Sequence, residues 1–192
     1  AVAHAPYYGM EHQTLVAYGA LFTDNDYGFD QLLLHEVAHE WWGNKITVSD
    51  WADFWIQEGF ATYAEALFVD QTLGEQRYLD YMGDLRRRVH NRVPIVKGDN
   101  LTSAEAYSDD IYFKGAWVLH TLRWLIGDAD LDQAIYRFAN DSKYAYGFVS
   151  SRDFIDLVFE KPWKSHSVTE FSIDQTGSGS EVTWTMTGPM TL

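Results

Sequence analysis

The sequence has no cysteine, which excludes disulfide frameworks, thiolate zinc clusters and cysteine nucleophiles. It also lacks any apolar run of about 18 residues, the length that a membrane span needs, so no membrane-spanning segment is expected. Basic residues are few, because 14 Lys and Arg against 28 Asp and Glu give a formal net charge of -14. This charge repels nucleic-acid phosphates, so nucleic acid is not expected as a partner. Any metal ion must be held by histidine and carboxylate side chains.

Apolar residues are plentiful, and their spacing is mostly helical. Hydrophobic residues make up 46% of the 192 residues and aromatic residues 16%, which is enough for a globular core in one domain of ordinary size. The apolar periodicity predicts six helices. They cover Phe29–Trp42, Asp53–Thr72, Glu75–Val89, Tyr112–Ile126, Leu131–Asn140 and a last segment from an N-cap at Ser150 or Ser151 to about Glu160.

Strand signals lie towards the two ends of the chain. Strand-forming residues over Gln13–Phe22 predict a short strand that needs a sheet neighbour. Beyond Pro162, apolar and polar residues alternate over Val168–Asp174 and Glu181–Thr187 around a Gly/Ser-rich turn, which predicts a β-hairpin. The polar segment Lys97–Asp110 predicts a long loop that lines a site. We therefore expect a predominantly α-helical α+β fold with a module boundary near Pro162.

A histidine pair with the spacing of a zinc site lies in the first predicted helix. In the run His35-Glu36-Val37-Ala38-His39 the two histidines are four residues apart, so both imidazoles share one helical face and can bind one Zn²⁺ ion. Glu36 lies beside the first histidine, where it can act on the metal's open position. The alternative is two surface histidines on an amphipathic helix, but their apolar neighbours would make unpartnered imidazoles costly to bury.

A catalytic zinc needs a third protein ligand and keeps its fourth position open for water. The second predicted helix offers Glu58 and Glu65, two turns apart on one face. Glu58 lies among large apolar residues, where a carboxylate without a partner would be costly, so we predict that it is the third ligand. Glu65 could accept a hydrogen bond from a ligand imidazole, or it could be a solvated carboxylate at the helix edge, and the sequence leaves both readings open.

These motifs resemble the zinc-binding core of the M1 family of metallo-aminopeptidases, gluzincins in which H-E-x-x-H is followed after eighteen residues by a ligand glutamate. Eighteen residues separate His39 from Glu58 here. The run Tyr8-Gly9-Met10-Glu11-His12 is similar to the family's exopeptidase motif, G-x-M-E-N, with glycine shifted by one place and histidine in place of asparagine. The run from Tyr107 to Gly115 is similar to the family's tyrosine motif.

The resemblance implies roles for two further residues. Glu11 would bind the free α-amino group of a peptide substrate, and Tyr112 would donate a hydrogen bond to the tetrahedral oxyanion. The resemblance also implies a thermolysin-like catalytic domain over residues 1–161, followed by residues 162–192 as a hairpin tail or the start of another module. The expected function is zinc-dependent hydrolysis of the first peptide bond of peptides with a free N-terminus, with Glu36 as the general base.

Other functions stay open at this point. If Glu11 does not lie where it can bind the substrate's α-amino group, the enzyme would be an endopeptidase. An epoxide hydrolase is a further alternative, because the family includes such a branch. A non-catalytic peptide-binding or scaffold fragment could also keep the zinc fold. Family members place a β-rich domain and several strands before the exopeptidase motif and a helical domain downstream, so we expect a fragment. The strand over Gln13–Phe22 would then be an uncovered edge unless missing domains of the same protein or another chain cover it. The sequence does not indicate a compartment.

Overall fold

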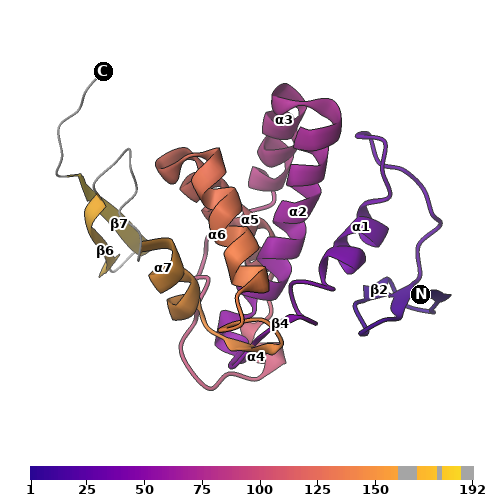
Figure 1. Ribbon diagram of the computed structural model, residues 1–192, viewed down its shortest axis with the longest axis horizontal. Coiled ribbons are helices and arrows are strands. Elements are labelled where there is room, and N and C mark those ends of the chain that lie inside the picture. The colour runs from indigo at the N-terminus through magenta and orange to yellow at the C-terminus, as the bar shows by residue number, and fades with distance from the viewer. Residues whose placement is uncertain (160–167, 177–178, 187–192) are drawn as a thin grey trace.

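The computed structural model describes residues 1–159, 168–176 and 179–186, and helices form most of it (Figure 1). The fold is therefore a predominantly helical α+β fold, as predicted. In chain order, the described elements are β1 Val2–His4, β2 Gly9–Met10, β3 Val16–Tyr18, α1 Gln31–Ala38, β4 Ile46–Val48, the 3₁₀ helix η1 Trp51–Asp53, α2 Trp55–Leu73, α3 Glu75–Arg86, α4 Ser103–Ala106, α5 Asp109–Ile126, α6 Asp128–Asn140, β5 Gly147–Val149, α7 Ser151–Phe159, β6 Val168–Thr176 and β7 Gly179–Met186.

Local charges and caps explain where several helices begin. α5 and α6 each begin three residues earlier than predicted, at Asp109 and Asp128, because acidic side chains in a first turn stabilise the positive end of the helix dipole. α7 begins behind Ser150, whose hydroxyl accepts a hydrogen bond from the backbone N–H of Asp153. The expected cap is therefore confirmed. The expected loop over Lys97–Asp110 contains the short helix α4, which the sequence pattern did not predict.

α1 is shorter than its sequence pattern indicated. It ends at Ala38 rather than Trp42, because the chain turns and Trp42 enters a β-bridge just before β4. β4 then pairs in parallel with β5, a sheet that was not predicted. Val37 and Trp41, which the pattern placed on the apolar face, are 38% and 48% exposed. The apolar periodicity therefore overstated both the length and the buried face of this helix.

The N-terminal segment forms a three-stranded sheet in the order β1-β3-β2. β3 pairs in parallel with β1 and antiparallel with β2, so it is the central strand. The expectation of an uncovered edge over Gln13–Phe22 was wrong, because the residues just before that segment supply both neighbours. The strand is also shorter than predicted, since Thr14 and Phe22 have φ angles of 68° and 52°, which extended strands do not allow.

Helices α2 and α5 approach closely enough for their backbones to touch. A Cβ atom on Gly59 would lie 2.8 Å from the Cα of Gly115, and a Cβ on Gly115 would lie equally close to the Cα of Gly59. Only glycine permits this approach at both positions. The contact brings the first turn of α2, which carries Glu58, next to the start of α5, which carries Tyr112.

We expect Gly115→Ala to lower the free energy of unfolding by about 1 to 3 kcal/mol, the usual cost of overfilling a packed interface. This cost should exceed the gain of about 1 kcal/mol that alanine brings to a helix. Gly83→Ala in α3 is the matched control, because a Cβ there meets nothing within 4 Å, so it should stabilise the protein slightly. Urea denaturation of both variants measures the difference, and equal midpoints would contradict the close helix contact.

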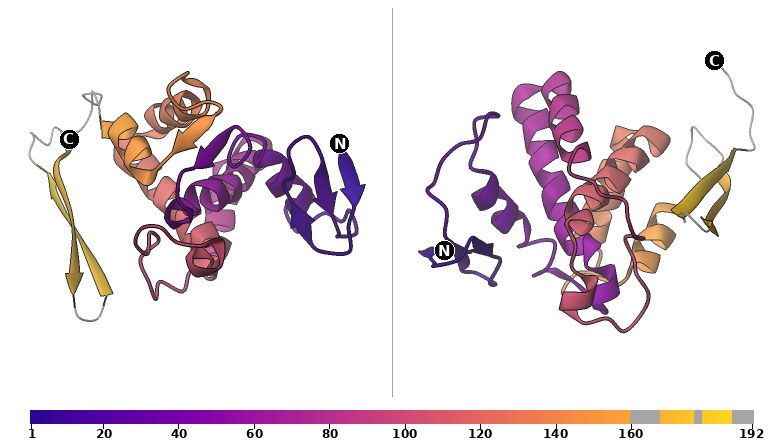
Figure 2. Two further views of the ribbon diagram at one scale, coloured as in Figure 1. Left: turned by 90° about the horizontal axis from the view of Figure 1, so that it is seen from below. Right: turned by 180° about the vertical axis from the view of Figure 1, so that it is seen from behind.

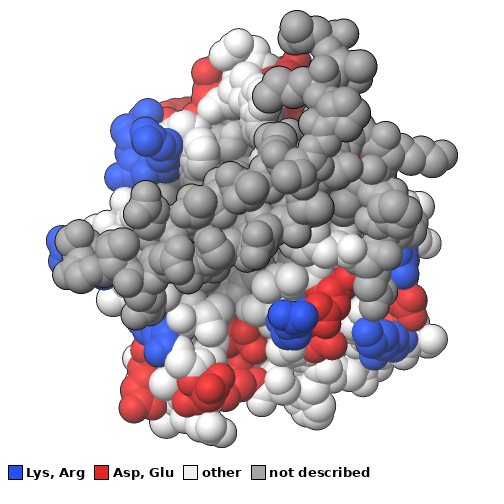
Figure 3. All heavy atoms as spheres, turned by 90° about the vertical axis from the view of Figure 1, so that its left-hand side faces the viewer, with Lys and Arg blue, Asp and Glu red and all other residues white. Residues whose placement is uncertain are grey.

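The arrangement in space puts α1 between the N-terminal sheet and α2 (Figures 1 and 2). Acidic and basic side chains are interspersed over the described part of the face in Figure 3. Among the described helices, none is both long enough and apolar enough to span a membrane.

β6 and β7 pair antiparallel, so the predicted hairpin is confirmed. The expected boundary at Pro162 lies outside the described residues.

Candidate metal centre

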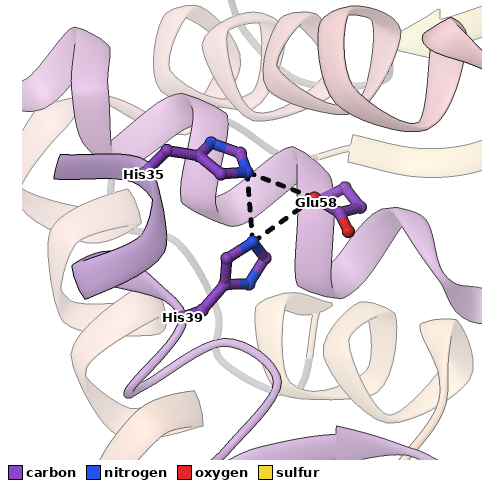
Figure 4. Close-up of side chains that lie close together, drawn as sticks. All are labelled: His35, His39 and Glu58. Atoms are coloured by element: carbon purple, nitrogen blue, oxygen red, sulfur yellow. Dashed lines mark hydrogen bonds and ion pairs between the residues drawn. The ribbon is translucent and has the colours of Figure 1, made fainter. Parts of the chain in front are cut away.

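Three ligand atoms converge at the junction of α1 and α2 (Figure 4). His35 lies in the last turn of α1, His39 caps its C-terminus, and Glu58 lies in the first turn of α2. The two Nε2 atoms are 3.1 Å apart, and Oε2 of Glu58 is 3.2 Å from His35 Nε2 and 3.4 Å from His39 Nε2. A tetrahedral zinc ion bound at its usual distances separates its ligand atoms by about 3.3 Å. The donor set therefore fits zinc in both chemistry and spacing.

The charges around this triangle favour a cation. Burial alone would raise the pKa of Glu58, but hydrogen bonds from the two histidines lower it to about 2, so the carboxylate is ionised at neutral pH. Burial alone would lower the pKa of His35, but Glu58 and Glu65 raise it to about 10. A divalent ion at the same position would meet the same negative potential.

The outer nitrogens of both imidazoles are fixed by buried acceptors. Nδ1 of His35 donates to Oε1 of Glu65 at 2.8 Å, and Nδ1 of His39 donates to the Trp42 carbonyl at 2.7 Å. Both rings therefore present Nε2 to the ligand triangle. Glu65 is 1% exposed and also accepts hydrogen bonds from Gln31 and Tyr81. This excludes the reading of Glu65 as a solvated carboxylate.

Glu36 faces the strand that carries the exopeptidase-like motif. It is buried, and no polar group hydrogen-bonds its Oε2 atom within residues 1–159. A Cβ on Gly9 would overlap Oε1 of Glu36 and come within 2.8 Å of Leu32, so a larger residue at this position would displace the Glu36 carboxylate. Burial raises the pKa of Glu36 to about 7, and the carboxylates of Glu11 and Glu58 add to that rise while both histidines oppose it. Oε2 of Glu36 can therefore accept a hydrogen bond from a proton donor such as water.

Glu11 follows β2 and is half-buried in the same site. Carboxylate oxygens of Glu11 and Glu36 and a ring nitrogen of His39 all lie within 4.8 Å of one another. The side chain of Asn44 holds this segment, because its Nδ2 donates to the Glu11 carbonyl oxygen at 2.9 Å. Sequence reasoning missed this contact, because Asn44 and Glu11 lie 33 residues apart in the chain.

Tyr112 lies beside His35, in the first turns of α5. Its ring stacks on that of His35, with centroids 5.9 Å apart, and meets Tyr107 edge to face at 6.0 Å. Burial, followed by the charge of Glu58, raises the pKa of Tyr112 above its ordinary value. The phenol therefore keeps its proton and can donate a hydrogen bond into the site.

All six residues singled out by sequence line one cleft of about 730 Å³. Glutamates, histidines and aromatic rings dominate its walls. The lining residues are Tyr8, Gly9, Met10, Glu11, Gln31, Leu32, His35, Glu36, His39, Glu58, Thr62, Glu65, Arg88, His90, Tyr107, Asp109, Tyr112 and Phe113. Sequence reasoning did not find Arg88 and His90, because no local motif connects them with the histidine pair, and it gave Asp109 no role although this residue lies in the tyrosine motif.

Comparison with protein families gives a match to the Peptidase family M1 domain over residues 1–175. Endoplasmic reticulum aminopeptidase 2 from Homo sapiens is 30% identical over 122 residues, which cover 59% of this chain and 13% of that protein. Aminopeptidase B from Homo sapiens is 25% identical over 170 residues, which cover 81% of this chain and 26% of that protein. The chain thus spans about a quarter or less of the length of these relatives.

Solved structures show the same likeness. The M1 zinc metallopeptidase of Deinococcus radiodurans, in a mutant form bound to the substrate Tyr-Ser-Ala, is 30% identical with a TM-score of 0.69, over 84% of this chain and 35% of that one. Leukotriene A4 hydrolase from Saccharomyces cerevisiae is 25% identical with a TM-score of 0.69, over 81% of this chain and 26% of that one. The described fold therefore matches the catalytic-domain portion of such structures.

Proposed function

The chain belongs to peptidase family M1, and we propose that its cleft is the centre of a zinc-dependent aminopeptidase that hydrolyses the first peptide bond of peptides with a free N-terminus. The observation that carries the proposal is the convergence of two imidazole nitrogens and one carboxylate oxygen, all 3.1 to 3.4 Å apart. Their spacing suits one tetrahedral ion. Family members are zinc metallopeptidases, and this donor set fits the same metal.

In this proposal His35, His39 and Glu58 hold the zinc ion. Bound there, zinc would act as a Lewis acid and lower the pKa of a water molecule. Glu36 accepts a proton from a water molecule, whose oxygen attacks the scissile carbonyl carbon, and delivers that proton to the amine as the peptide C–N bond breaks. Its buried oxygen without a hydrogen-bond partner supports this role, because a proton donor is what that atom lacks within residues 1–159.

Glu11 and Tyr112 act on the substrate. Glu11 binds the α-ammonium group of the first residue by a charge-assisted hydrogen bond, and this contact aligns the first peptide bond with the metal. Ligand atoms of Glu11, Glu36 and His39 lie within 4.8 Å of one another. This spacing supports a short distance between the bound ammonium group and the first peptide bond. Tyr112 donates to the developing oxyanion, a contribution typically worth about 3 to 4 kcal/mol in acyl transfer.

A non-catalytic peptide-binding or scaffold fragment is the alternative function. The chain corresponds to 13% and 26% of the two curated relatives compared above. Metal content and turnover separate the two functions, because a scaffold could bind zinc but would release no amine.

The test uses a leucine arylamide with a free amino group and the same compound with an N-acetyl group. We expect the zinc-loaded protein to hydrolyse the free compound and to act on the acetylated one at least about 100-fold more slowly, because acetylation removes the cation that Glu11 binds. Release of the arylamine measures both rates. Equal rates would point to an endopeptidase or a non-specific hydrolase, and no release from either would favour the scaffold.

A further inference from the structure

One residue of the cleft has a charge that the proposed reaction does not use. Five carboxylates line the cleft, those of Glu11, Glu36, Glu58, Glu65 and Asp109. Among the described lining residues, Arg88 alone carries a permanent positive charge. An arginine in an acidic cleft would be expected to pair with one of these carboxylates. Its actual contacts are therefore informative.

Arg88 is held over an aromatic ring instead of in an ion pair. It lies two residues beyond the end of α3, and its guanidinium carbon is 3.8 Å from the centroid of the Phe113 ring. The ion pairs within residues 1–159 do not include it, whereas its neighbour Arg87 pairs with Asp84. Stacking fixes the plane of a guanidinium and leaves its N–H edge available for a second partner.

The two carboxylates at the start of α5, those of Asp109 and Asp110, have other partners. Asp109 accepts a hydrogen bond from Nε2 of His90 at 3.3 Å. Asp110 is buried and accepts the backbone N–H groups of His90 and Asn91, each at 2.8 Å. These bonds fasten the segment after Arg88 to the start of α5, whereas the Arg88 residue itself is exposed.

Arg88 and Glu11 belong to different groups of contacts in the cleft. Glu11 is grouped with His39, since a ring nitrogen of His39 lies within 4.8 Å of its carboxylate. Arg88 stacks on Phe113, which follows Tyr112, and the ring of Tyr112 stacks on His35. The cleft therefore has an anionic group beside His39 and a cationic group that is linked to His35 through the rings of Phe113 and Tyr112.

We propose that Arg88 binds a carboxylate carried by the part of the substrate that follows the scissile bond. The inference rests on the proposed aminopeptidase function, in which Glu11 holds the first residue. Each further residue of an extended peptide adds about 3.3 to 3.6 Å, so the second and third residues pass the metal towards Arg88. The carboxylate is either the free C-terminus of a short peptide or an acidic side chain in its second position.

Binding measurements test this separately from turnover. The zinc-loaded Glu36→Gln protein is titrated calorimetrically with Leu-Ala-Ala as the free acid and as the C-terminal amide, and with the amides of Leu-Glu-Ala and Leu-Gln-Ala. We expect a carboxylate in at least one pair to tighten binding about tenfold or more, the worth of a hydrogen bond to a charged group. The pair that responds identifies the source of the carboxylate.

The variant Arg88→Gln, added to the same background, should abolish the preference for a carboxylate. It should change the binding of the peptides without a carboxylate, Leu-Ala-Ala amide and Leu-Gln-Ala amide, by less than about twofold. Arg87→Gln is the matched control, because Arg87 is an exposed neighbour outside the cleft lining, and it should keep the preference. The inference is overturned if carboxylate peptides show no preference, if the preference survives Arg88→Gln, or if no peptide binds. Failure of the proposed function would instead show as absent hydrolysis by the protein with Glu36 intact.

Discussion

Replacing Glu36 by glutamine is expected to lower kcat for hydrolysis of a leucine arylamide by about 10² to 10⁴-fold, the usual contribution of a general acid-base group. The amide cannot accept the proton of water, but it keeps the shape of the side chain. Because Glu36 is not one of the three converging ligands, the variant should bind zinc with the stoichiometry of the parent protein. Initial rates and metal analysis on one preparation give both results.

Glu75→Gln is the matched control for this change. It removes the same charge from an exposed residue in the first turn of α3, away from the cleft lining. It should therefore leave kcat within about twofold of the parent value, as surface substitutions usually do. If Glu36→Gln kept full activity, Glu36 would not be the general base, whatever metal the protein held.

Removing Glu58 should have the largest effect on metal binding. Structural zinc sites bind with about 10 to 16 kcal/mol in total, so loss of one of three protein ligands should weaken zinc binding on the order of 100-fold or more. Glu58→Ala also leaves His35 and His39 without the carboxylate that now lies 3.2 and 3.4 Å from them. Competition with a fluorescent chelator measures the dissociation constant, and circular dichroism checks that the helices persist.

Glu11→Ala provides the comparison for Glu58→Ala. Glu11 is half-buried and lies in the same cleft, but it belongs to the group with Glu36 and not to the triangle of closest atoms. Zinc affinity should therefore change little, whereas KM for substrates with a free amino group should rise. If both variants lost zinc equally, the division between a metal ligand and a substrate anchor would be wrong.

Some parts of the fold could be predicted because their signals are local. Apolar spacing over 10 or more residues located α2, α3, α5 and α6 to within about three residues, and strand alternation located the β6–β7 hairpin. β1, β2, β4 and β5 have only two or three residues each. Segments so short contain no full period, and their pairing depends on partners distant in the chain. The end of α1 was wrong because the turn towards β4 overrode its helical pattern.

The candidate site likewise has features that local sequence signals predicted and features that they did not. The chain itself determined which residue types could hold a metal, because His35 and His39 at a spacing of four share one side of a helical turn, and buried Glu58 needed a cation. Only the tertiary structure decided that Glu65 and the Trp42 carbonyl orient the two imidazoles. It alone also decided that Gly59 and Gly115 bring Tyr112 next to the helix that carries Glu58 and that Arg88 lines the cleft. Contacts of this kind join segments far apart in the chain, and they arise from the packing of whole helices, which no local spacing of residues encodes.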